Sequence, residues 1–310
     1  HTTAYAILSG LVGSEMCIRD RITNVPLISK KFADGELYVQ IQQSIRGCDV
    51  FLVQPTCAPV NDSLMELMIM VDACKRASAR QITAVIPYYG YARADRKTSG
   101  RESITAKLTA NLLEKSGVDR VLAMDLHSAQ IQGYFDIPCD HIYGSPVLID
   151  YLETLNLEEV VVVSPDVGGV ARARAFAKQM NDAPLAIIDK RRAAHNIAES
   201  LTVIGEVKGK TAILIDDMID TGGTICSGAS LLKREGAKRI FACASHAVFS
   251  PPSYERLSAE DLFEQVIVTN SIPVLVKNNF PQLKVLSVAN MLGEAIWRIH
   301  EESSVSSMFR

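Results

Sequence analysis

Residues 211–224 read TAILIDDMIDTGGT, an apolar segment that leads into acidic residues and then into a glycine turn. Ala212 to Ile215 form a short apolar run that is typical of a buried parallel strand, and Ile225 to Gly236 have the pattern of a helix ended by glycine. The turn between them is therefore predicted at the carboxyl end of a strand, where open α/β sheets bind their ligands.

The residue types of this turn favour a phosphorylated sugar as the ligand. The glycines of Thr221–Thr224 permit positive φ and close approach, and its threonines and free backbone N–H groups can hold a phosphate. Carboxylates accept hydrogen bonds, so Asp216 and Asp217 suit the vicinal hydroxyls of a ribose or a hydrated Mg²⁺. The alternative is an acidic residue that complements a helix dipole beside an ordinary Gly-Gly turn.

Composition narrows the class of protein. A chain of 310 residues is long for one domain and comfortable for two. A net charge of -3 argues against nucleic acid as the main partner. The seven cysteines form no C-x-x-C pair and accompany no histidine cluster, which favours a reducing compartment, by default the cytoplasm, over a disulfide framework or a zinc site. No apolar stretch reaches the roughly 18 residues of a membrane span, so no membrane partner is expected.

Apolar runs alternate with helical patterns along the chain. This alternation predicts parallel sheets covered by helices, and two successive sheets are favoured over one large sheet. A boundary near Tyr143–Pro146 gives domains of residues 1–144 and 145–310. The predicted strands are Val50–Val53, Ile82–Ile86, Val121–Met124, Val160–Val163, Leu185–Ile188, Ala212–Ile215, Ile240–Ala244 and Val266–Val268, and the predicted helices are Asp62–Ala77, Ile104–Lys115, Val170–Met180 and Ile225–Arg234.

Two further segments of the first half suit a nucleotide. Lys31–Glu36 places an aromatic ring near two carboxylates, which could stack on a purine and accept hydrogen bonds from its exocyclic amine, although the segment taken by itself is better explained as a D-G hairpin turn. Pro87–Lys97 places three cations after a strand, which suits a polyphosphate or a solvated basic loop. His127 leaves another strand end, either as a ligand or as a merely hydrogen-bonded side chain.

The second half repeats this arrangement. Asp166 and a Gly-Gly turn follow the strand at Val160–Val163, so Asp166 is a candidate ligand of Mg²⁺ or ribose. Asp189–Arg192 ends a strand with three adjacent cations, which a phosphoryl-type transition state needs, while a solvated loop is the alternative.

Taken in order, these motifs resemble the ribose-phosphate pyrophosphokinase family of the bacterial class I type, and the loop at Asp216–Thr224 is similar to the phosphoribosyl-pyrophosphate loop of type I phosphoribosyltransferases. The resemblance runs from about Lys31 to the C-terminus. It rests on Phe32–Glu36, Asn61–Leu67, Thr105–Leu108, Asp125–His127, Gln130–Pro138, Ser164–Asp166, Asp189–Arg192 and Asp216–Thr224.

The resemblance implies two tandem type I phosphoribosyltransferase-like, Rossmann-like domains, with the active site in the cleft between them. It implies transfer of the β,γ-diphosphate of Mg²⁺-ATP to the anomeric hydroxyl of ribose 5-phosphate for nucleotide biosynthesis, in a homohexamer with ADP and phosphate as effectors. It assigns catalysis to Lys190 and Arg192, ATP binding to Phe32, Asp34, Gly35, Glu36 and Arg93, metal binding to His127 and Asp166, and ribose 5-phosphate binding to Asp216, Asp217, Asp220, Thr221, Gly222, Gly223 and Thr224. The loop at Phe32–Glu36 would come from a neighbouring subunit.

The sequence also departs from that family. Ala94 stands where members usually carry glutamine, and Ala193–Asn196 replaces a proline-rich continuation of the catalytic loop. His1 to about Arg21 do not resemble the first strand and helix of the family, which suggests a non-native start and an incomplete edge of the first domain. Two rivals therefore stay open: a phosphoribosyltransferase, and a catalytically silent regulatory homologue.

Overall fold

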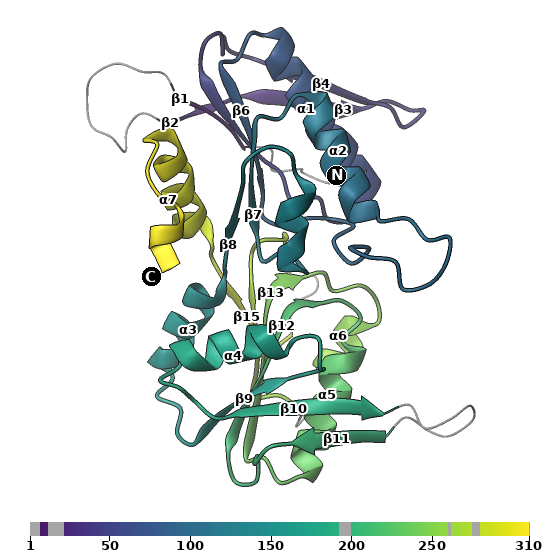
Figure 1. Ribbon diagram of the computed structural model, residues 1–310, viewed down its shortest axis with the longest axis vertical. Helices are drawn as coiled ribbons and strands as arrows, with labels where there is room; N and C mark the ends of the chain where they lie inside the picture. The colour runs from purple at the N-terminus through teal and green to yellow at the C-terminus, as the bar shows by residue number, and fades with distance from the viewer. Residues whose placement is uncertain (1–6, 12–21, 192–199, 260–261, 275–279, 310) are drawn as a thin grey trace. The chain divides into compact units, whose positions relative to one another are not determined.

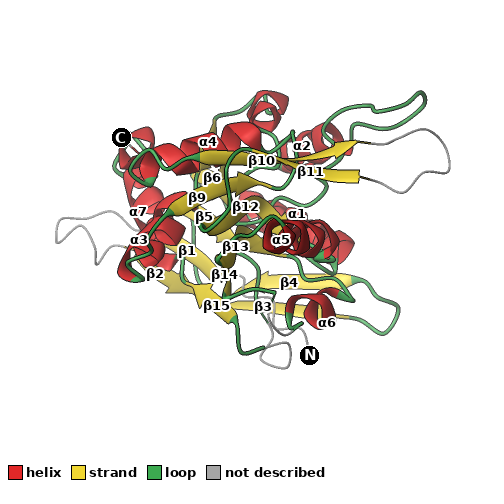
Figure 2. Cartoon of the chain, turned by 90° about the horizontal axis from the view of Figure 1, so that it is seen from below, coloured by secondary structure: helices red, strands yellow, loops and turns green. Residues whose placement is uncertain are grey.

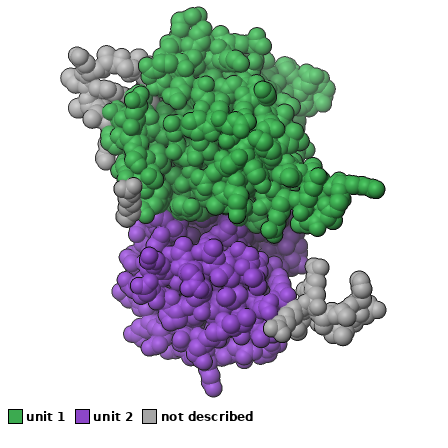
Figure 3. Space-filling model, in the orientation of Figure 1, with its two compact units in different colours: residues 1–143, 289–310 green, residues 144–288 purple. Residues whose placement is uncertain are grey.

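The computed structural model describes residues 7–11, 22–191, 200–259, 262–274 and 280–309. The chain divides into two compact units, which Figure 3 colours separately. Unit 1 comprises residues 1–143 and 289–310, and unit 2 comprises residues 144–288. None of the described helices is long and apolar enough to cross a membrane.

Unit 1 contains a six-stranded sheet with the strand order β2-β1-β5-β6-β7-β8 (Figure 1). β5 to β8 are parallel, whereas β1 is antiparallel to both β2 and β5. A separate antiparallel hairpin is formed by β3 and β4. The elements of the unit are β1 (Ile7–Leu11), β2 (Ile22–Val25), β3 (Leu27–Lys31), β4 (Leu37–Ile41), β5 (Asp49–Val53), α1 (Val60–Arg76), β6 (Gln81–Ile86), α2 (Thr105–Ser116), β7 (Arg120–Met124), η1 (Ala129–Tyr134), β8 (Cys139–Ile142), α7 (Ala289–His300) and η3 (Ser306–Phe309).

Unit 2 contains a seven-stranded sheet with the order β11-β10-β9-β12-β13-β14-β15, in which only β11 runs antiparallel to its neighbour (Figure 2). Alternate side chains of its central strands enter two different cores: Val161 and Val163 pack with α5, whereas Val162 packs with α3 and α4. The elements are α3 (Ser145–Thr154), β9 (Val160–Ser164), α4 (Val170–Gln179), β10 (Leu185–Arg191), β11 (Ser200–Ile204), β12 (Thr211–Ile219), α5 (Gly223–Arg234), β13 (Arg239–Ala247), α6 (Ser253–Leu257), β14 (Gln265–Thr269) and β15 (Leu283–Leu286).

All eight predicted strands and all four predicted helices are present, but several strands extend beyond their apolar runs, and two of these extensions contain predicted site residues. β12 continues to Ile219 and β10 to Arg191, so Asp216, Asp217 and Lys190 lie within strands instead of after them. The reason is pairing: the residue opposite Asp216 is Ala244 of β13, and the residue opposite Lys190 is Leu201 of β11. Backbone hydrogen bonds to a neighbouring strand therefore extend each strand into polar sequence.

The C-terminal segment Ala289–Arg310 belongs to unit 1, whereas the sequence predicted a second domain that continues to residue 310. Its side chains contact residues of the first half of the chain: Nδ1 of His300 lies 3.3 Å from Oδ2 of Asp49, and the ring of Phe309 meets that of Tyr143 edge-on. At the other end of the chain, Ile7–Leu11 form β1 between β2 and β5. The rest of the atypical N-terminal stretch, residues 1–6 and 12–21, lies outside the described residues.

Candidate active site

Three adjacent parallel strands of unit 2 bring the predicted site residues to one edge of the sheet. β10, β9 and β12 are neighbours in that order, and their carboxyl ends carry Lys190, Asp166 and Asp216 respectively. Because parallel strands end at the same edge, residues from three distant parts of the sequence meet there. Arg192, the second predicted catalytic cation, and the altered segment Ala193–Asn196 lie outside the described residues.

Lys190 reaches the glycine turn from β10. Ile188, two residues earlier, packs in the core beneath α5, so the strand alternation places Lys190 on that same face. Its Nζ lies 3.4 Å from Oγ1 of Thr224, the second residue of α5. Gly228 of α5 permits this close approach, since an added Cβ would lie 2.8 Å from Cδ1 of Ile188. The predicted cation and the predicted phosphate loop are therefore adjacent.

The acidic pair of β12 is held by an arginine of α4. Nη1 of Arg172 lies 3.2 Å from Oδ1 of Asp216 and 3.1 Å from Oδ1 of Asp217. Asp217 is only 2% exposed, and its backbone N–H donates to Oδ1 of Asp216. Burial, followed by the neighbouring carboxylate of Asp217, raises the pKa of Asp216, while the guanidinium of Arg172 lowers it. Arg172 therefore opposes, without cancelling, the rise in the pKa of Asp216 that burial and Asp217 cause.

Arg172 was missed by the sequence reasoning, although a signal for it exists. It is the third residue of α4, and a cation in the first turn of a helix opposes the helix dipole. Such a residue needs a compensating partner, and the acidic pair supplies it.

The turn after β12 has the backbone of an anion-binding site. Gly222 has a φ of 74° and immediately precedes α5, so its conformation is one that side-chain-bearing residues rarely adopt. Thr221 lies beside a fixed cation, because Nη1 of Arg256 donates to its carbonyl oxygen at 3.1 Å. An added Cβ at Gly223 would lie 3.2 Å from the same nitrogen. Asp220 is half-buried just before this turn. The helix start, with its free N–H groups, can therefore receive a phosphate.

Asp166 offers a hard oxygen ligand at the next strand end. Its side chain is exposed, its Oδ1 accepts a hydrogen bond of 2.8 Å from the N–H of Gly169, and its carbonyl oxygen accepts one from Ser164. Within the described part of the chain, no cluster of three or more acidic, histidine or cysteine side chains is arranged around one metal position. This donor set fits Mg²⁺, which takes one or two carboxylates and fills its other positions with water and substrate phosphate oxygens.

In unit 1, the predicted adenine loop is the tip of the hairpin β3–β4. Phe32 is 53% exposed and meets the ring of Tyr38 edge-on, with centroids 6.2 Å apart. The turn is closed by a hydrogen bond from the N–H of Phe32 to the carbonyl of Glu36 and by a second from the N–H of Glu36 to Oδ1 of Asp34. Gly35 supplies the positive φ of 99° that the turn needs. A D-G hairpin turn and an exposed aromatic ring therefore coexist here.

The cationic segment and the histidine turn follow β6 and β7 of the same unit. Arg93 is exposed, and the segment after it is organised by Glu102, whose carboxylate accepts hydrogen bonds from Ser99 and from the N–H of Thr98. These bonds lower the pKa of Glu102 to about 2. His127 is also exposed, and the residue before it is fixed, because the N–H of Leu126 donates to Nε2 of His141 at 3.0 Å.

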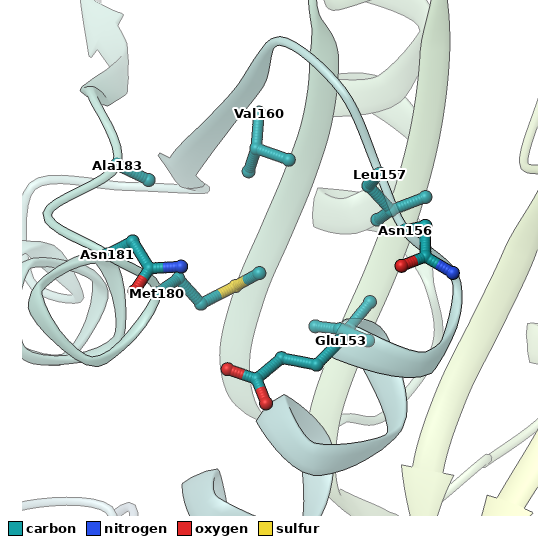
Figure 4. A pocket seen from close by; sticks show the side chains of 8 residues that line it. Glu153, Asn156, Leu157, Val160, Met180, Asn181 and Ala183 are labelled. Atoms are coloured by element: carbon teal, nitrogen blue, oxygen red, sulfur yellow. The ribbon is translucent and has the colours of Figure 1, made fainter.

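A pocket of about 410 Å³ lies at the opposite end of β9 (Figure 4). Figure 4 shows Glu153, Asn156, Val160 and Met180 around it, from α3, the start of β9 and the end of α4. Val160 begins the strand that ends just before Asp166, so this pocket is separate from the candidate site.

Comparisons with known proteins show the family of this chain. Residues 10–117 match the sequence profile of the N-terminal domain of ribose phosphate pyrophosphokinase, and residues 191–310 match that of the phosphoribosyl synthetase-associated domain. The ribose-phosphate pyrophosphokinase of Prochlorococcus marinus subsp. pastoris is 93% identical over 289 residues, which cover 93% of this chain and 87% of that protein. The chain belongs to the ribose-phosphate pyrophosphokinase family.

Other members of the ribose-phosphate pyrophosphokinase family support the same assignment. The protein of that name from Synechococcus elongatus is 77% identical over 285 residues, which cover 92% of this chain and 86% of that protein. The crystal structure of phosphoribosylpyrophosphate synthetase from Mycobacterium smegmatis superposes with a TM-score of 0.86 at 45% identity, covering 91% of this chain and 92% of that one. The predicted family, fold class and enzyme class, a ribose-phosphate diphosphokinase among the transferases and kinases of nucleotide biosynthesis, are thereby confirmed.

Proposed function

We propose that this enzyme makes 5-phosphoribosyl 1-pyrophosphate from ATP and ribose 5-phosphate. The observation that carries the proposal is the adjacency of Lys190 to the Thr221–Thr224 turn, beside the acidic pair and Asp166, at the carboxyl edge of unit 2. A cation, an anion-binding helix start and paired carboxylates together match a phosphorylated sugar whose hydroxyl attacks phosphorus.

In the proposed reaction, the anomeric hydroxyl oxygen of ribose 5-phosphate attacks the β-phosphorus of ATP. A new O–P bond forms, the bond from the β-phosphorus to the α-bridging oxygen breaks, the hydroxyl proton is released and AMP leaves. Residues 220–224 hold the 5-phosphate, while Asp216 and Asp217 accept hydrogen bonds from the ribose hydroxyls. Lys190 and Arg192 stabilise the charge that develops on the transferred diphosphate.

ATP would be held mainly by residues of unit 1. Phe32 stacks on adenine, Asp34, Gly35 and Glu36 read its edge, and Arg93 binds the polyphosphate. Mg²⁺ would neutralise polyphosphate charge when it is bound. Its preference for oxygen favours Asp166 as a direct ligand, with His127 placed toward metal-bound water or phosphate.

Self-association as a homohexamer is part of the proposal. One face of α2 exposes Ile104, Leu108 and Leu112 at a spacing of four residues, with exposed fractions of 37%, 52% and 40%. An apolar stripe of this kind supports contact with another copy of the chain. The mass of the assembly, measured by light scattering, tests it.

The effectors ADP and phosphate are proposed for unit 1. Ser303 to Ser306 line a pocket of about 440 Å³ together with Gln81, the ion pair of Arg120 with Asp140, and Glu302. The guanidinium and the hydroxyls could bind a phosphate group, against the repulsion of the two carboxylates. Titration of activity with ADP and with phosphate tests this part. The cytoplasmic location stays a prediction.

The decisive experiment incubates the protein with Mg²⁺, ATP and ribose 5-phosphate and separates the products by chromatography. Equal amounts of AMP and 5-phosphoribosyl 1-pyrophosphate establish diphosphoryl transfer. ATP binding without AMP favours the silent regulatory homologue, and consumption of added 5-phosphoribosyl 1-pyrophosphate with a base favours a phosphoribosyltransferase.

Lys190 provides the sharpest test of the mechanism. We expect Lys190→Ala to lower kcat by about a hundredfold or more, because removing one preorganised donor costs about 2.7–4 kcal/mol of transition-state stabilisation. Lys178→Ala, at the far end of α4, is the matched control and should keep the wild-type rate. A near-normal rate for Lys190→Ala would remove this residue from the mechanism.

A further inference from the structure

Helix α1 carries a buried carboxylate that the proposed reaction does not use. Glu66 is 6% exposed and lies among the core-facing residues Leu64, Leu67 and Met70. A carboxylate in such surroundings is costly unless its oxygens accept hydrogen bonds. It belongs to the segment Asn61–Leu67, which is one of the family-like motifs of the sequence but has no role in the reaction described above.

Both oxygens of Glu66 are bonded, and the donors come from two other elements. Oγ of Ser29, in β3, donates to Oε1 of Glu66. Nε2 of Gln54, directly after β5, donates to Oε2 at 3.0 Å. One carboxylate of α1 therefore connects the hairpin β3–β4 to the main sheet of unit 1.

Two further contacts of the same helix end reach the segments that are proposed to bind ATP. Asp62, one turn before Glu66, pairs with Nζ of Lys31 at 2.5 Å, and Lys31 directly precedes Phe32. The hydroxyl of Tyr91, which lies two residues before Arg93, donates to Oδ1 of Asn61. The first turns of α1 thus contact the base of the adenine loop and the start of the cationic segment.

The hairpin is packed along its strands but exposed at its tip. Of its residues, Leu27, Val39 and Ile41 pack against the core from the strands, while the tip around Phe32 is exposed (Figure 1). A loop that is free to move must be ordered when it binds a base, and that ordering weakens binding.

We propose that residues 61–66 of α1 act as a clamp, with Glu66 as its main positioning residue, which holds the base of the adenine loop and the start of the cationic segment in place, each for the ATP molecule that it binds. The inference rests on the proposed function and deepens it, because it assigns positioning residues to the ATP site. The clamp acts on ATP, and its residues all belong to unit 1.

The test compares Glu66→Ala with Glu66→Gln. The alanine removes both acceptors. The glutamine keeps Oε1 as the acceptor for Ser29. Its new amide group can donate to Oε1 of Gln54 if the side-chain amide of Gln54 flips. That oxygen is buried and has no hydrogen-bond partner among the described residues. We expect Glu66→Ala to raise KM for ATP about tenfold, the size of one charge-assisted hydrogen bond, with KM for ribose 5-phosphate and kcat within twofold of wild type. Glu66→Gln should restore KM for ATP to within about threefold.

Asp72→Ala is the matched control, because it removes a carboxylate and its ion pair with Arg76 from the same helix, away from the hairpin. Ser29→Ala is a milder second variant that removes only the hairpin side of the clamp, should Glu66→Ala fail to fold. Backbone amide exchange at Phe32 and Gly35 reports the clamp without any substrate, and it should quicken in Glu66→Ala and Ser29→Ala but not in Asp72→Ala.

An unchanged KM for ATP with unchanged exchange at the hairpin would overturn the clamp. So would a uniform loss, in which both KM values, kcat and melting temperature shift together and Glu66→Gln behaves like Glu66→Ala, since Glu66 would then be only structural. If the wild type forms no AMP, the proposed function fails, and amide exchange still decides whether the clamp exists.

Discussion

Arg172 is a single side chain that influences the protonation of both carboxylates of the acidic pair. It lies within 3.2 Å of both carboxylates of a pair in which one member is 2% exposed. Without this guanidinium, only the backbone N–H of Asp217 opposes burial and mutual repulsion, and the pKa of Asp216 rises further. An ionised carboxylate accepts hydrogen bonds at both oxygens, whereas a protonated carboxyl has less acceptor capacity, so the protonation state of the pair bears on the binding of ribose hydroxyls.

We therefore expect Arg172→Gln to raise KM for ribose 5-phosphate about tenfold at neutral pH and to move the acid limb of the kcat/KM profile to higher pH. The substitution should also destabilise the fold, and by an amount that depends on pH. A carboxyl whose folded pKa is raised stabilises the fold below its unfolded pKa, and this contribution is lost as pH rises through the folded value. The substitution should therefore lower the free energy of unfolding by about 3 kcal/mol at pH 9 and by much less near pH 4.

Arg174→Gln, on the same helix, is the control for this prediction, and urea titrations at both pH values measure the stabilities. Equal destabilisation at pH 4 and pH 9 would mean that Arg172 acts through packing and not through the charge of the acidic pair.

At the scale of secondary-structure elements, the sequence located the strands well and their ends poorly. The run Ala212–Ile215 predicts a buried strand because every residue is apolar, yet β12 continues through two aspartates. The continuation depends on pairing with β13, a strand that lies across α5 in the sequence. The local sequence does not show which strand will be the pairing partner. Short strands of mixed composition, such as β8 and β11, were not predicted for the same reason.

The sequence likewise predicted one part of the candidate site and not the other. The residues at strand ends were predictable, because parallel strands deliver their carboxyl ends to one edge. The contacts that orient them, such as Arg172 to Asp216 and Glu66 to Ser29, join residues whose proximity only the folded chain defines.

The turn Thr98–Glu102 is an element whose stability depends on one carboxylate. Glu102 accepts hydrogen bonds from Ser99 and Thr98, which lower its pKa to about 2. A depressed folded pKa gives a stabilisation that is present above the ordinary value of 4.5 and is lost as pH falls through about 2. At neutral pH Glu102 is therefore ionised, and its contribution to the stability of the turn is present.

We expect Glu102→Gln to quicken amide exchange at Thr98 and Ser99 and to raise KM for ATP roughly fivefold, the difference between a charge-assisted and a neutral hydrogen bond. Exchange measured by mass spectrometry and steady-state kinetics give the two readouts, with Asp72→Asn as the control. Amide exchange at the wild-type rate would show that the turn is stable without the hydrogen bonds to the carboxylate of Glu102.

At the scale of the whole molecule, the C-terminal segment is the clearest case of information that sequence order hides. Residues 289–310 follow unit 2 in the chain but belong to unit 1. The segment is held there by specific contacts. Asp49, a side chain of β5 that is 10% exposed, lies 3.3 Å from His300 and receives a paired hydrogen bond from Arg80. A division of the chain into consecutive halves cannot anticipate a helix that returns to the first unit.

Trp297, the single tryptophan of the chain, lies in this returning helix and reports on unit 1 alone. We expect Asp49→Asn to lower the free energy of unfolding followed by its fluorescence by about 1–3 kcal/mol, because Arg80 loses its charged acceptor and His300 loses the carboxylate beside it. Glu264→Gln removes a comparable paired contact, that with Arg239 in unit 2, and should leave the fluorescence transition in place if the units unfold separately. Amide exchange in Asp49→Asn should accelerate in β5 and α7 together. Exchange of α7 in step with β14 instead of β5 would contradict the assignment of the C-terminal segment to unit 1.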